Sequence, residues 1–426
     1  MLLLSLLPAA AAGTLAEAWE AAETHGTELP LAHEQRLQTD AQRTQSWALL
    51  GPKVVAGADY TINEYEVTLD FADMIPEELA PLLGDTTTEP IVLNKKQYLQ
   101  WNASVIQPIF SPKGWAQFAA AGPAAKAGRE GEAGQRAAIK QGIAAAYYGV
   151  VVAREGARIA EGALTSAQAH QKLAEQQVTV GLAPPTARLQ AEIAVSRAER
   201  DLASAREGVT KAQEGLARLT GWSVDEPVTL PEPPTLPYAG TAEAEERALT
   251  SRPDVLAAVY RERAATYGRW ASDLDWLPTL DGRFTYSYNE NTGFSDDKTM
   301  WMVVFSAKWT LWDGGARIGA EQAAASQRRM ASLAAERARD MASEDVRKAW
   351  SAYETAGKSL VAVEHESELA RENLRLSEVA FQAGTITFLD LEDARLGARA
   401  SELARLQQRM SRDLAALTLL ATTGDL

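Results

Sequence analysis

Hydrophobic and polar residues follow two patterns along the chain. Four short segments alternate apolar and polar residues with a period of two, which is typical of β-strands with one apolar face. These segments lie at about residues 53–68, 97–111, 278–291 and 299–312. The stretches around them are rich in Ala, Glu, Arg and Leu, the composition of long helices that pack on neighbours. The pattern therefore predicts a mainly α chain that carries four strands.

The helical stretches differ in length and regularity. The longest is expected from about Gly315 to Gln382, and at 1.5 Å per residue it would span roughly 100 Å. A helix of this length needs partner helices in a coiled-coil bundle. In the first half of the chain, Pro123 and several nearby glycines predict a break or bend before about Gln135. Shorter helical stretches, Leu15–Leu50 and Ala242–Leu274, open the two halves.

The chain repeats its order of elements. A turn at Val180-Gly181-Leu182 has a counterpart 203 residues later (181 to 384) at Ala383-Gly384-Thr385. The segment Leu219-Thr220-Gly221 matches Thr422-Thr423-Gly424 with the same offset. Both turns are expected to end helices, because glycine tolerates the left-handed conformation of a helix C-terminus. The sequence therefore predicts a tandem repeat of strands followed by a helical hairpin.

The repeats define the expected domain boundaries. Residues 13–221 form the first repeat, with its hairpin tip at 180–185, and residues 242–426 form the second, with its tip at 383–386. Residues 222–241 are a proline-rich extended linker. Upstream, the offset rises to 226 (51 to 277), which a long loop inserted between Asp70 and Lys96 explains.

The N-terminus has the character of a secretory signal peptide. An apolar run from Leu2 to Ala12 ends in small residues suited to cleavage, so residues 1–12 are assigned to this signal, although a positive leading region is missing. A buried N-terminal helix is the alternative. The chain has no cysteine, which excludes disulfides and lipidation at an N-terminal cysteine. The net charge of −15 argues against nucleic-acid binding.

The four strands carry the functional argument. An apolar face with aromatic ends opposite a polar face is the signature of membrane-barrel strands. A soluble sheet covering a one-sided core is the alternative. Four strands are too few to close on themselves, and their edges would be open to aggregation unless several protomers share one barrel. The residues expected to face lipid are Tyr60, Trp101, Phe284, Tyr286, Tyr288, Trp301, Phe305 and Trp309.

Several short motifs resemble the TolC family of outer-membrane factors over nearly the whole mature length. Each motif is weak separately, but their order and spacing within a tandem repeat are specific. The motifs are Arg252-Pro253-Asp254-Val255, Trp276-Leu277-Pro278-Thr279-Leu280, Trp309-Thr310-Leu311-Trp312-Asp313-Gly314-Gly315, and Gly384-Thr385 followed by Phe388-Leu389-Asp390.

The resemblance implies a homotrimer in which four strands per protomer form a twelve-stranded β-barrel in the outer membrane. A twelve-helix coiled-coil α-barrel would continue from it into the periplasm. Such a duct contacts outer-membrane lipid and serves an efflux pump or a type I secretion system, carrying drugs, small molecules or proteins. Its implied partners are a periplasmic adaptor (membrane fusion protein) and an inner-membrane pump of the RND, ABC or MFS class. The adaptor would dock at Val180, Gly181 and Leu182 and at Ala383, Gly384 and Thr385.

The resemblance also implies a narrowed periplasmic entrance lined by aspartates, which here are Asp390 and Asp393. Their spacing of three places both on one helical face, and threefold symmetry would make each a ring of carboxylates that favours cations. Solvated acids near a helix N-terminus are the alternative. Where the best-known member has a tyrosine and an arginine that tether the closed entrance, this chain has Phe381 and Ile386. We therefore expect closure to rely on packing of these two residues.

Catalytic and cofactor chemistry is not expected. The four histidines are scattered without metal-ligand spacing, and no nucleophile elbow or phosphate loop stands out. We expect no cofactor, no metal and no enzyme activity. The competing hypotheses are a periplasmic hydrolase and a soluble periplasmic coiled-coil structural protein. The second of these would leave the strand aromatics without lipid or a core to cover them.

Overall fold

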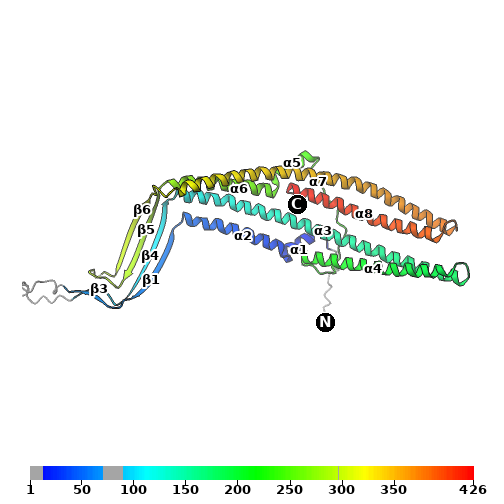
Figure 1. The fold of residues 1–426 in the computed structure, drawn as a ribbon, viewed down its shortest axis with the longest axis horizontal. Helices are drawn as coiled ribbons and strands as arrows, with labels where there is room; N and C mark the ends of the chain where they lie inside the picture. The colour runs from blue at the N-terminus through cyan, green and yellow to red at the C-terminus, as the bar shows by residue number, and fades with distance from the viewer. Residues whose placement is uncertain (1–12, 71–89, 296) are drawn as a thin grey trace, which may run out of the picture. The chain divides into compact units, whose positions relative to one another are not determined.

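The computed structural model describes residues 13–70, 90–295 and 297–426 of the chain. The expected signal peptide and most of the inserted loop before Lys96 lie outside the described residues. The described chain is mainly helical, with one four-stranded and one two-stranded sheet (Figure 1). It divides into two units: unit 1 combines residues up to 38 with 127–259 and 334–426, and unit 2 combines 39–126 with 260–333.

The elements follow one another as two similar halves. The first half contains α1 (Leu15–His25), α2 (Glu28–Ser46), β1 (Lys53–Ile62), β2 (Val67–Leu69), β3 (Ile91–Asn94), β4 (Gln97–Phe110), α3 (Pro112–Thr179) and α4 (Pro185–Thr220). The second half contains α5 (Thr241–Ser251), α6 (Pro253–Asp273), β5 (Thr279–Asn289), β6 (Thr299–Lys308), α7 (Ala316–Gln382) and α8 (Phe388–Thr423). Single 3-10 turns at Trp47–Leu49 and Leu274–Trp276 precede β1 and β5.

The tandem repeat is confirmed at the level of single hydrogen bonds. Helices α4 and α8 each have 36 residues, and each ends at a left-handed glycine, Gly221 or Gly424. One residue earlier, the hydroxyl of Thr220 donates to the carbonyl of Leu216 at 2.9 Å. The hydroxyl of Thr423 makes the equivalent bond at 3.1 Å. Both threonines are fully buried, so the two helix ends are built in the same way.

The long helices differ from the expectation in one respect. Helix α7 begins one residue after the predicted start and ends at the predicted Gln382. Helix α3 runs without interruption from Pro112 and includes Pro123, so the expected break before Gln135 is wrong. A proline removes one helical donor, whereas the alanines on the same face of the helix, Ala116 and Ala127, are buried. Packing of this face supports the helix across the proline, as tertiary contacts commonly override propensity.

Unit 1 contains one core for each repeat. In the first, α1, α3 and α4 meet around Tyr147 and Ile143. In the second, α5, α7 and α8 meet around Val346 and Leu419. Leu29 of α2 also enters the first core, whose side chains are larger than those of the second. The equivalent helices of the two repeats are therefore packed with different volumes.

A buried polar contact joins the two repeats within unit 1. The hydroxyl of Tyr148 in α3 donates to Asp413 in α8 at 3.0 Å, and Arg412 forms an ion pair with the same carboxylate at 2.8 Å. Asp413 is fully buried. Burial raises the pKa of this carboxyl, while Arg412, the Tyr148 hydroxyl and Arg409 act in the opposite direction. The carboxylate thus depends on its partners, since an unpaired buried charge is strongly unfavourable.

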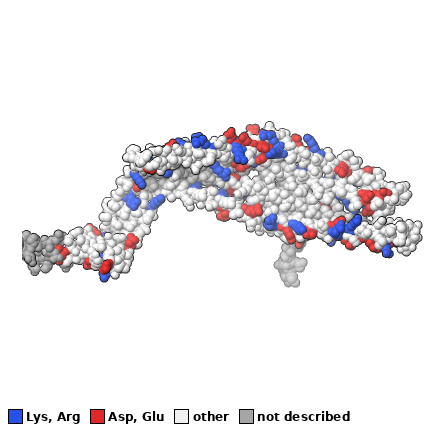
Figure 2. Space-filling model, viewed as in Figure 1, with Lys and Arg blue, Asp and Glu red and all other residues white. Residues whose placement is uncertain are grey.

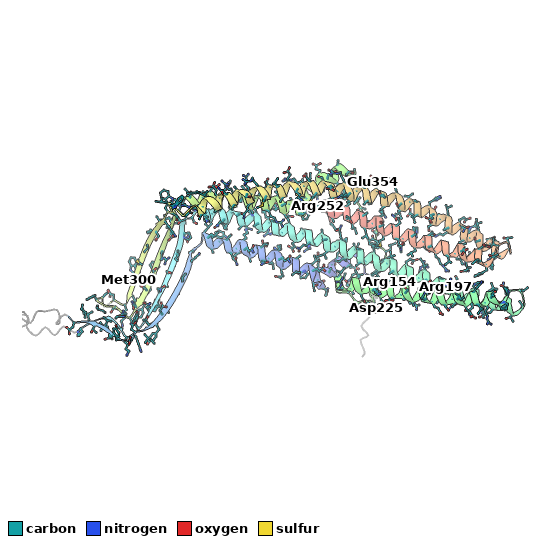
Figure 3. The ribbon with its side chains drawn as sticks, in the orientation of Figure 1. Arg154, Arg197, Asp225, Arg252, Met300 and Glu354 are labelled. Carbon is teal, nitrogen blue, oxygen red and sulfur yellow. The ribbon has the colours of Figure 1, made fainter. Side chains whose placement is uncertain are left out.

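The proline-rich linker is bonded to the helices of unit 1. The hydroxyl of Tyr147 lies 2.7 Å from the carbonyl oxygen of Gly13 and 2.8 Å from that of Thr229, and it accepts from the Thr229 amide. Arg154, which lies near the linker in Figure 3, donates to the carbonyl of Glu226 at 2.8 Å. The backbone groups of the extended linker therefore form hydrogen bonds with side chains of the helices, whereas a helix would pair its backbone groups internally.

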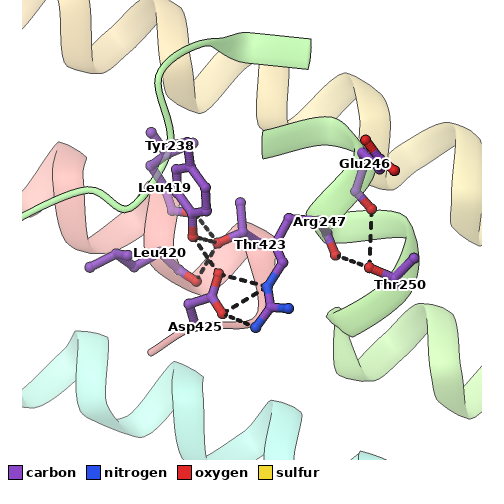
Figure 4. Close-up of polar contacts among 8 residues, drawn as sticks. All are labelled: Tyr238, Glu246, Arg247, Thr250, Leu419, Leu420, Thr423 and Asp425. Carbon is purple, nitrogen blue, oxygen red and sulfur yellow. Dashed lines mark hydrogen bonds and ion pairs between the residues drawn. The ribbon is translucent and has the colours of Figure 1, made fainter. Parts of the chain in front are cut away.

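The linker ends in a second polar cluster (Figure 4). The hydroxyl of Tyr238 bonds to Thr423 and to Asp425, and Arg247 of α5 forms an ion pair with Asp425 at 2.7 Å. Burial, followed by the hydrogen bond to Asp425, raises the pKa of Tyr238 to about 12. The phenol therefore stays protonated and joins the linker to the end of α8 at neutral pH.

Removal of the Tyr147 hydroxyl tests the attachment of the linker. We expect Tyr147→Phe to lower the free energy of unfolding by about 0.5–1.5 kcal/mol, because the Thr229 amide loses its partner at a part-buried position. The measurement is chemical denaturation in detergent followed by circular dichroism. Tyr65→Phe, at an exposed tyrosine of unit 2, is the control and should unfold as wild type. Equal stability of the two variants would contradict the proposed attachment.

Candidate functional site

The four-stranded sheet of unit 2 has the order β1-β4-β5-β6, with antiparallel pairing throughout. The pairing of β4 with β5 joins the two repeats into one sheet. Strands β1 and β6 each have a partner on one side only, so both outer edges present unpaired backbone groups. The short strands β2 and β3 form a separate two-stranded sheet.

The register brings the apolar positions of all four strands to one face. Directly opposed residues of antiparallel strands share a face, so each row across the sheet can be read from the pairing. One row contains Val54, Val105, Phe284 and Val303; the next contains Ala56, Ala103, Tyr286 and Trp301; a third contains Ala58, Trp101, Tyr288 and Thr299. Seven of the eight residues expected to face lipid lie on this face; Tyr60 and Phe305 occupy further rows.

Aromatic side chains on the apolar face are both exposed and mutually packed. Trp301 is 68% exposed and Phe305 is 71% exposed. The ring of Trp101 lies 5.7 Å from that of Tyr286 and is stacked at 6.0 Å on that of Tyr288. A contiguous exposed apolar face of this kind marks a surface that is covered by another phase or partner.

The opposite face of the sheet is mostly polar. One row pairs Asn102 with Ser287, and the neighbouring row pairs Ser104 with Thr285. In β6 the same face carries Met300 and Met302, so its polarity decreases toward that edge. The sheet therefore has one apolar face and one mostly polar face.

Trp309, the eighth residue expected to face lipid, lies just beyond β6, which ends at Lys308. Its indole donates to the carbonyl of Trp276 at 3.1 Å. The guanidinium of Arg317 lies 4.3 Å from the Trp276 ring centroid and pairs with Asp313 at 2.8 Å. Two tryptophans of the quoted motifs, Trp276 and Trp309, together with Arg317 just beyond them, thus hold the connection between β6 and α7 in unit 2.

The two helical hairpins of unit 1 reverse at turns of identical geometry. Gly181 and Gly384 have φ values of 79° and 72°, a left-handed conformation that residues with a Cβ adopt only at a cost. The amide of Leu182 donates to the carbonyl of Gln177 at 2.8 Å. The amide of Thr385 makes the equivalent bond at 3.0 Å. Each turn is thus a glycine-capped helix end closed by its own backbone.

The surfaces of the two turns differ in chemistry. Val180 and Leu182 are 67% and 81% exposed, which makes the first turn an apolar projection. The second turn has Ala383 and Thr385 in the same places, and the Thr385 hydroxyl donates to the carbonyl of Ala380. The first turn therefore has a larger apolar area available for a partner.

Asp390 has a structural role as well as an exposed charge. With Thr387 it forms a capping box at the start of α8: the Asp390 carboxylate accepts from the Thr387 amide at 2.8 Å and from its hydroxyl at 2.6 Å. These bonds lower the pKa of Asp390. Asp393 makes no hydrogen bond or ion pair with the described residues, and both aspartates line a shallow hollow that also includes Ile386. Three of the four residues expected at the gate therefore lie together, and Phe381 is not among them.

Phe381 packs against a residue that sequence reasoning did not single out. Its ring meets that of Phe388 edge-on at 5.9 Å, and the other contact of Phe388 is a stack on the imidazole of His170 at 3.7 Å. Phe388 appeared in the sequence only as part of a family motif, and His170 as one of four scattered histidines. No local pattern could have joined two residues on different helices that lie so far apart in the chain.

Charge and metal chemistry in the described parts of the chain are unremarkable. In the view of Figure 2, acidic and basic side chains alternate over the helices without an extended basic patch. Within residues 13–70, 90–295 and 297–426, no group of three or more His, Cys, Asp or Glu side chains is arranged to hold a metal. Among the same residues, no helix combines the length and the hydropathy that are needed to cross a bilayer.

Comparison with known proteins identifies the family. The family model described as outer membrane efflux protein matches residues 26–222 and 245–425, so the chain belongs to the outer membrane efflux protein family. No curated protein matches the sequence significantly. Membership makes this an outer-membrane protein of an efflux-channel family, which agrees with the location and the resemblance expected from the sequence.

Solved structures have the same fold at low sequence identity. The CmeC outer membrane channel of Campylobacter jejuni is similar with a TM-score of 0.77 and 14% identity, covering 96% of this chain and 85% of that chain. The outer membrane protein VceC of Vibrio cholerae gives 0.73 and 18%, with 96% of each chain covered. The MtrE channel of Neisseria gonorrhoeae, solved in an open state, gives 0.74 and 20%, with 96% and 88% covered. The predicted fold class is thereby confirmed.

Substitutions of the two aspartates test whether Asp390 caps α8. We expect Asp390→Ala to accelerate hydrogen exchange of the Thr387 amide, which loses its acceptor, whereas Asp393→Ala should leave that amide unchanged. In the wild type the bond should persist as pH falls and be lost only below about pH 4, because the folded-state pKa is lowered from an ordinary value of about 3.9. Mass-spectrometric exchange at several pH values measures both effects. Equal exchange in the two variants would contradict the cap.

Proposed function

We propose that the chain is one protomer of a passive trimeric outer-membrane channel, the exit duct of a tripartite efflux pump or of a type I secretion system. The observation that carries this proposal is the four-stranded sheet with one apolar face and two open edges. Pairing β6 of one protomer with β1 of the next removes every edge once the ring closes. Three protomers then supply twelve strands, with the apolar faces toward lipid and the polar faces toward water.

Strand length supports a membrane location for this sheet. Strands β1, β5 and β6 have 10, 11 and 10 residues, and tilted strands of about 9–11 residues cross the hydrocarbon core of a bilayer. Strand β4 is longer, with 14 residues. The exposed Tyr60, Trp301 and Phe305 on the apolar face would then contact lipid, and Trp309, just beyond β6, would lie at the interface that aromatic residues favour.

The helices of unit 1 suit the periplasmic part of such a duct. Hairpins α3–α4 and α7–α8 would supply four helices from each protomer to a twelve-helix barrel, with the turns at its far end. We assign adaptor docking to these turns, since Val180 and Leu182 of the first turn are exposed apolar residues. The partner pump would be of the RND, ABC or MFS class. It would supply the energy and most of the choice of cargo, because a wide aqueous tunnel discriminates weakly.

The entrance of the duct would be lined by acidic residues. Threefold symmetry turns Asp390 and Asp393, one helical turn apart, into two rings of three carboxylates. A ring of acids at a constriction attracts cations and repels anions. Ile386 lines the same hollow as these aspartates, and Phe381 packs on Phe388 at the start of α8. We assign both residues to the packing that narrows the entrance.

The orientation of the sheet is tested by a pair of lysine substitutions in adjacent strands. Trp301→Lys places a charge on the apolar face, which costs about 2–4 kcal/mol near the middle of a bilayer. We expect this variant to lose its trimer in detergent extracts of outer membranes. Ser287→Lys introduces the same residue on the polar face and should leave the trimer intact. Similar behaviour of both variants, or a water-soluble wild-type monomer, would refute the duct.

The charge of the entrance is tested by Asp393→Asn, because this carboxylate has no hydrogen bond to lose within the described structure. We expect the ratio of cation to anion permeability of reconstituted trimers to fall toward one. Asp225→Asn, which makes the same charge change in the linker, is the control and should retain the wild-type ratio. The reversal potential under a salt gradient measures the ratio. An unchanged ratio in Asp393→Asn would remove this residue from the entrance.

A further inference from the structure

A stacked pair of rings connects the two repeats close to the second turn. The imidazole of His170 in α3 lies parallel to the ring of Phe388, with an interplanar angle of 8° and centroids 3.7 Å apart. Both residues are half-buried. Phe381 covers Phe388 from α7, so three helices meet in one aromatic cluster. Four residues before His170 in α3, the guanidinium of Arg399 in α8 donates to the hydroxyl of Ser166 at 2.9 Å.

The position of Phe388 allows this cluster to restrain the start of α8. Phe388 is the first residue of α8, and Asp390 follows two positions later. A contact that holds the first turn of α8 against α3 therefore sets the position of the acidic residues on that turn. The stack acts together with the capping box and the buried Leu391 in restraining the start of α8.

The charged groups around the cluster come from α7 and α8. Glu392 of α8 acts on His170 electrostatically, but its carboxylate is paired with Arg395 at 2.9 Å. Glu378 of α7 lies 3.7 Å from Arg395. Asp390 is turned toward Thr387 in the capping box. Arg399 contributes positive charge from α8 beside α3.

We propose that His170 is a positioning residue of the periplasmic entrance: its neutral imidazole holds α8 to α3 through Phe388, and its protonation releases the entrance. This inference rests on the proposed duct, because it assigns a role to α8 at the end that carries Asp390 and Asp393. The ligand of the site is the proton, and acidification of the periplasm is the signal.

The direction of the effect follows from burial. Burial lowers the pKa of His170, and the attraction of Glu392 opposes this without reversing it. A released, hydrated imidazole would have the ordinary value of about 6.5. The stacked state therefore binds fewer protons than the released state. Its stability is complete above about pH 6.5 and decreases as the pH falls below that value.

The test compares single-channel recordings of reconstituted trimers between about pH 7.5 and about pH 5.5, the range in which a histidine titrates. We expect the open probability of the wild type to rise on acidification. His170→Phe keeps a ring in the stack without a titratable group, so it should stay at the low, neutral-pH value throughout. His170→Ala removes the ring and should be open at both values. His365→Phe, at an exposed histidine, should behave as wild type.

A second measurement does not depend on conductance. Because the chain contains no cysteine, Ser166→Cys with Arg399→Cys introduces a unique pair of thiols across α3 and α8. We expect acidification to slow the cross-linking of these thiols by a short bifunctional reagent. The slowing should be larger when His170 is present than in the His170→Phe background. The two backgrounds have the same thiol chemistry, so the difference between them reports on His170.

The outcomes separate this inference from the proposed duct. A pH response retained by His170→Phe, or a wild-type entrance that closes in acid, would overturn the role of His170 while leaving the duct intact. Cross-linking that slows equally in both backgrounds would also overturn the role of His170 and leave the duct intact. Absence of trimers and of conductance would refute the duct, and the cross-linking difference would then report on His170 alone.

Discussion

The structure depends on one constraint: a sheet of four amphipathic strands has an apolar face and two open edges that the protomer cannot cover. Closing the sheet on itself would require more strands, and the aromatic rows around Tyr286 and Trp301 are exposed in the described part of the protomer. Backbone groups at the β1 and β6 edges need partners wherever water is excluded. Association with further copies in a bilayer satisfies both requirements together.

The tandem repeat explains why one chain can contribute an even share to a symmetric duct. Helices α4 and α8 have equal lengths and matching ends, and the hairpins reverse at glycines with the same backbone bonds. Identical local geometry gives the two hairpins similar lengths. Their surfaces then diverge, since the first turn is apolar and the second carries the acidic residues. Duplication thus accounts for the common shape of the two hairpins, and substitution accounts for the different surfaces of their turns.

The second turn illustrates how one residue can serve stability and function. Asp390 caps α8 through Thr387, and its exposed charge is oriented by the same bonds. Phe388, between these two residues in sequence, points to His170 instead. The start of α8 is therefore defined by a polar cap and an aromatic stack. A shift of either contact would move the acidic residues that we assign to the entrance.

Some failures of sequence reasoning are as informative as its successes. Pro123 predicts a break because proline lacks a donor, yet α3 continues, since buried alanines around it are packed on neighbours. Trp309 continues the alternation of β6, but it lies past the end of the strand, where its indole bonds to Trp276. In both places the local preference of the residue is real, but contacts that form only in the folded chain outweigh it.

The sequence alone determined those features that depend on local sterics and on the periodicity of apolar residues. Period-two alternation marked the four strands, helical composition and glycine marked the hairpins, and internal repetition linked them. The tertiary structure decided the strand order β1-β4-β5-β6, the rows that share a face, and the meeting of His170 with Phe388. Four strands of similar amphipathic character fit several orders equally well. Pairing of distant residues depends on packing across the whole chain, which no local pattern encodes.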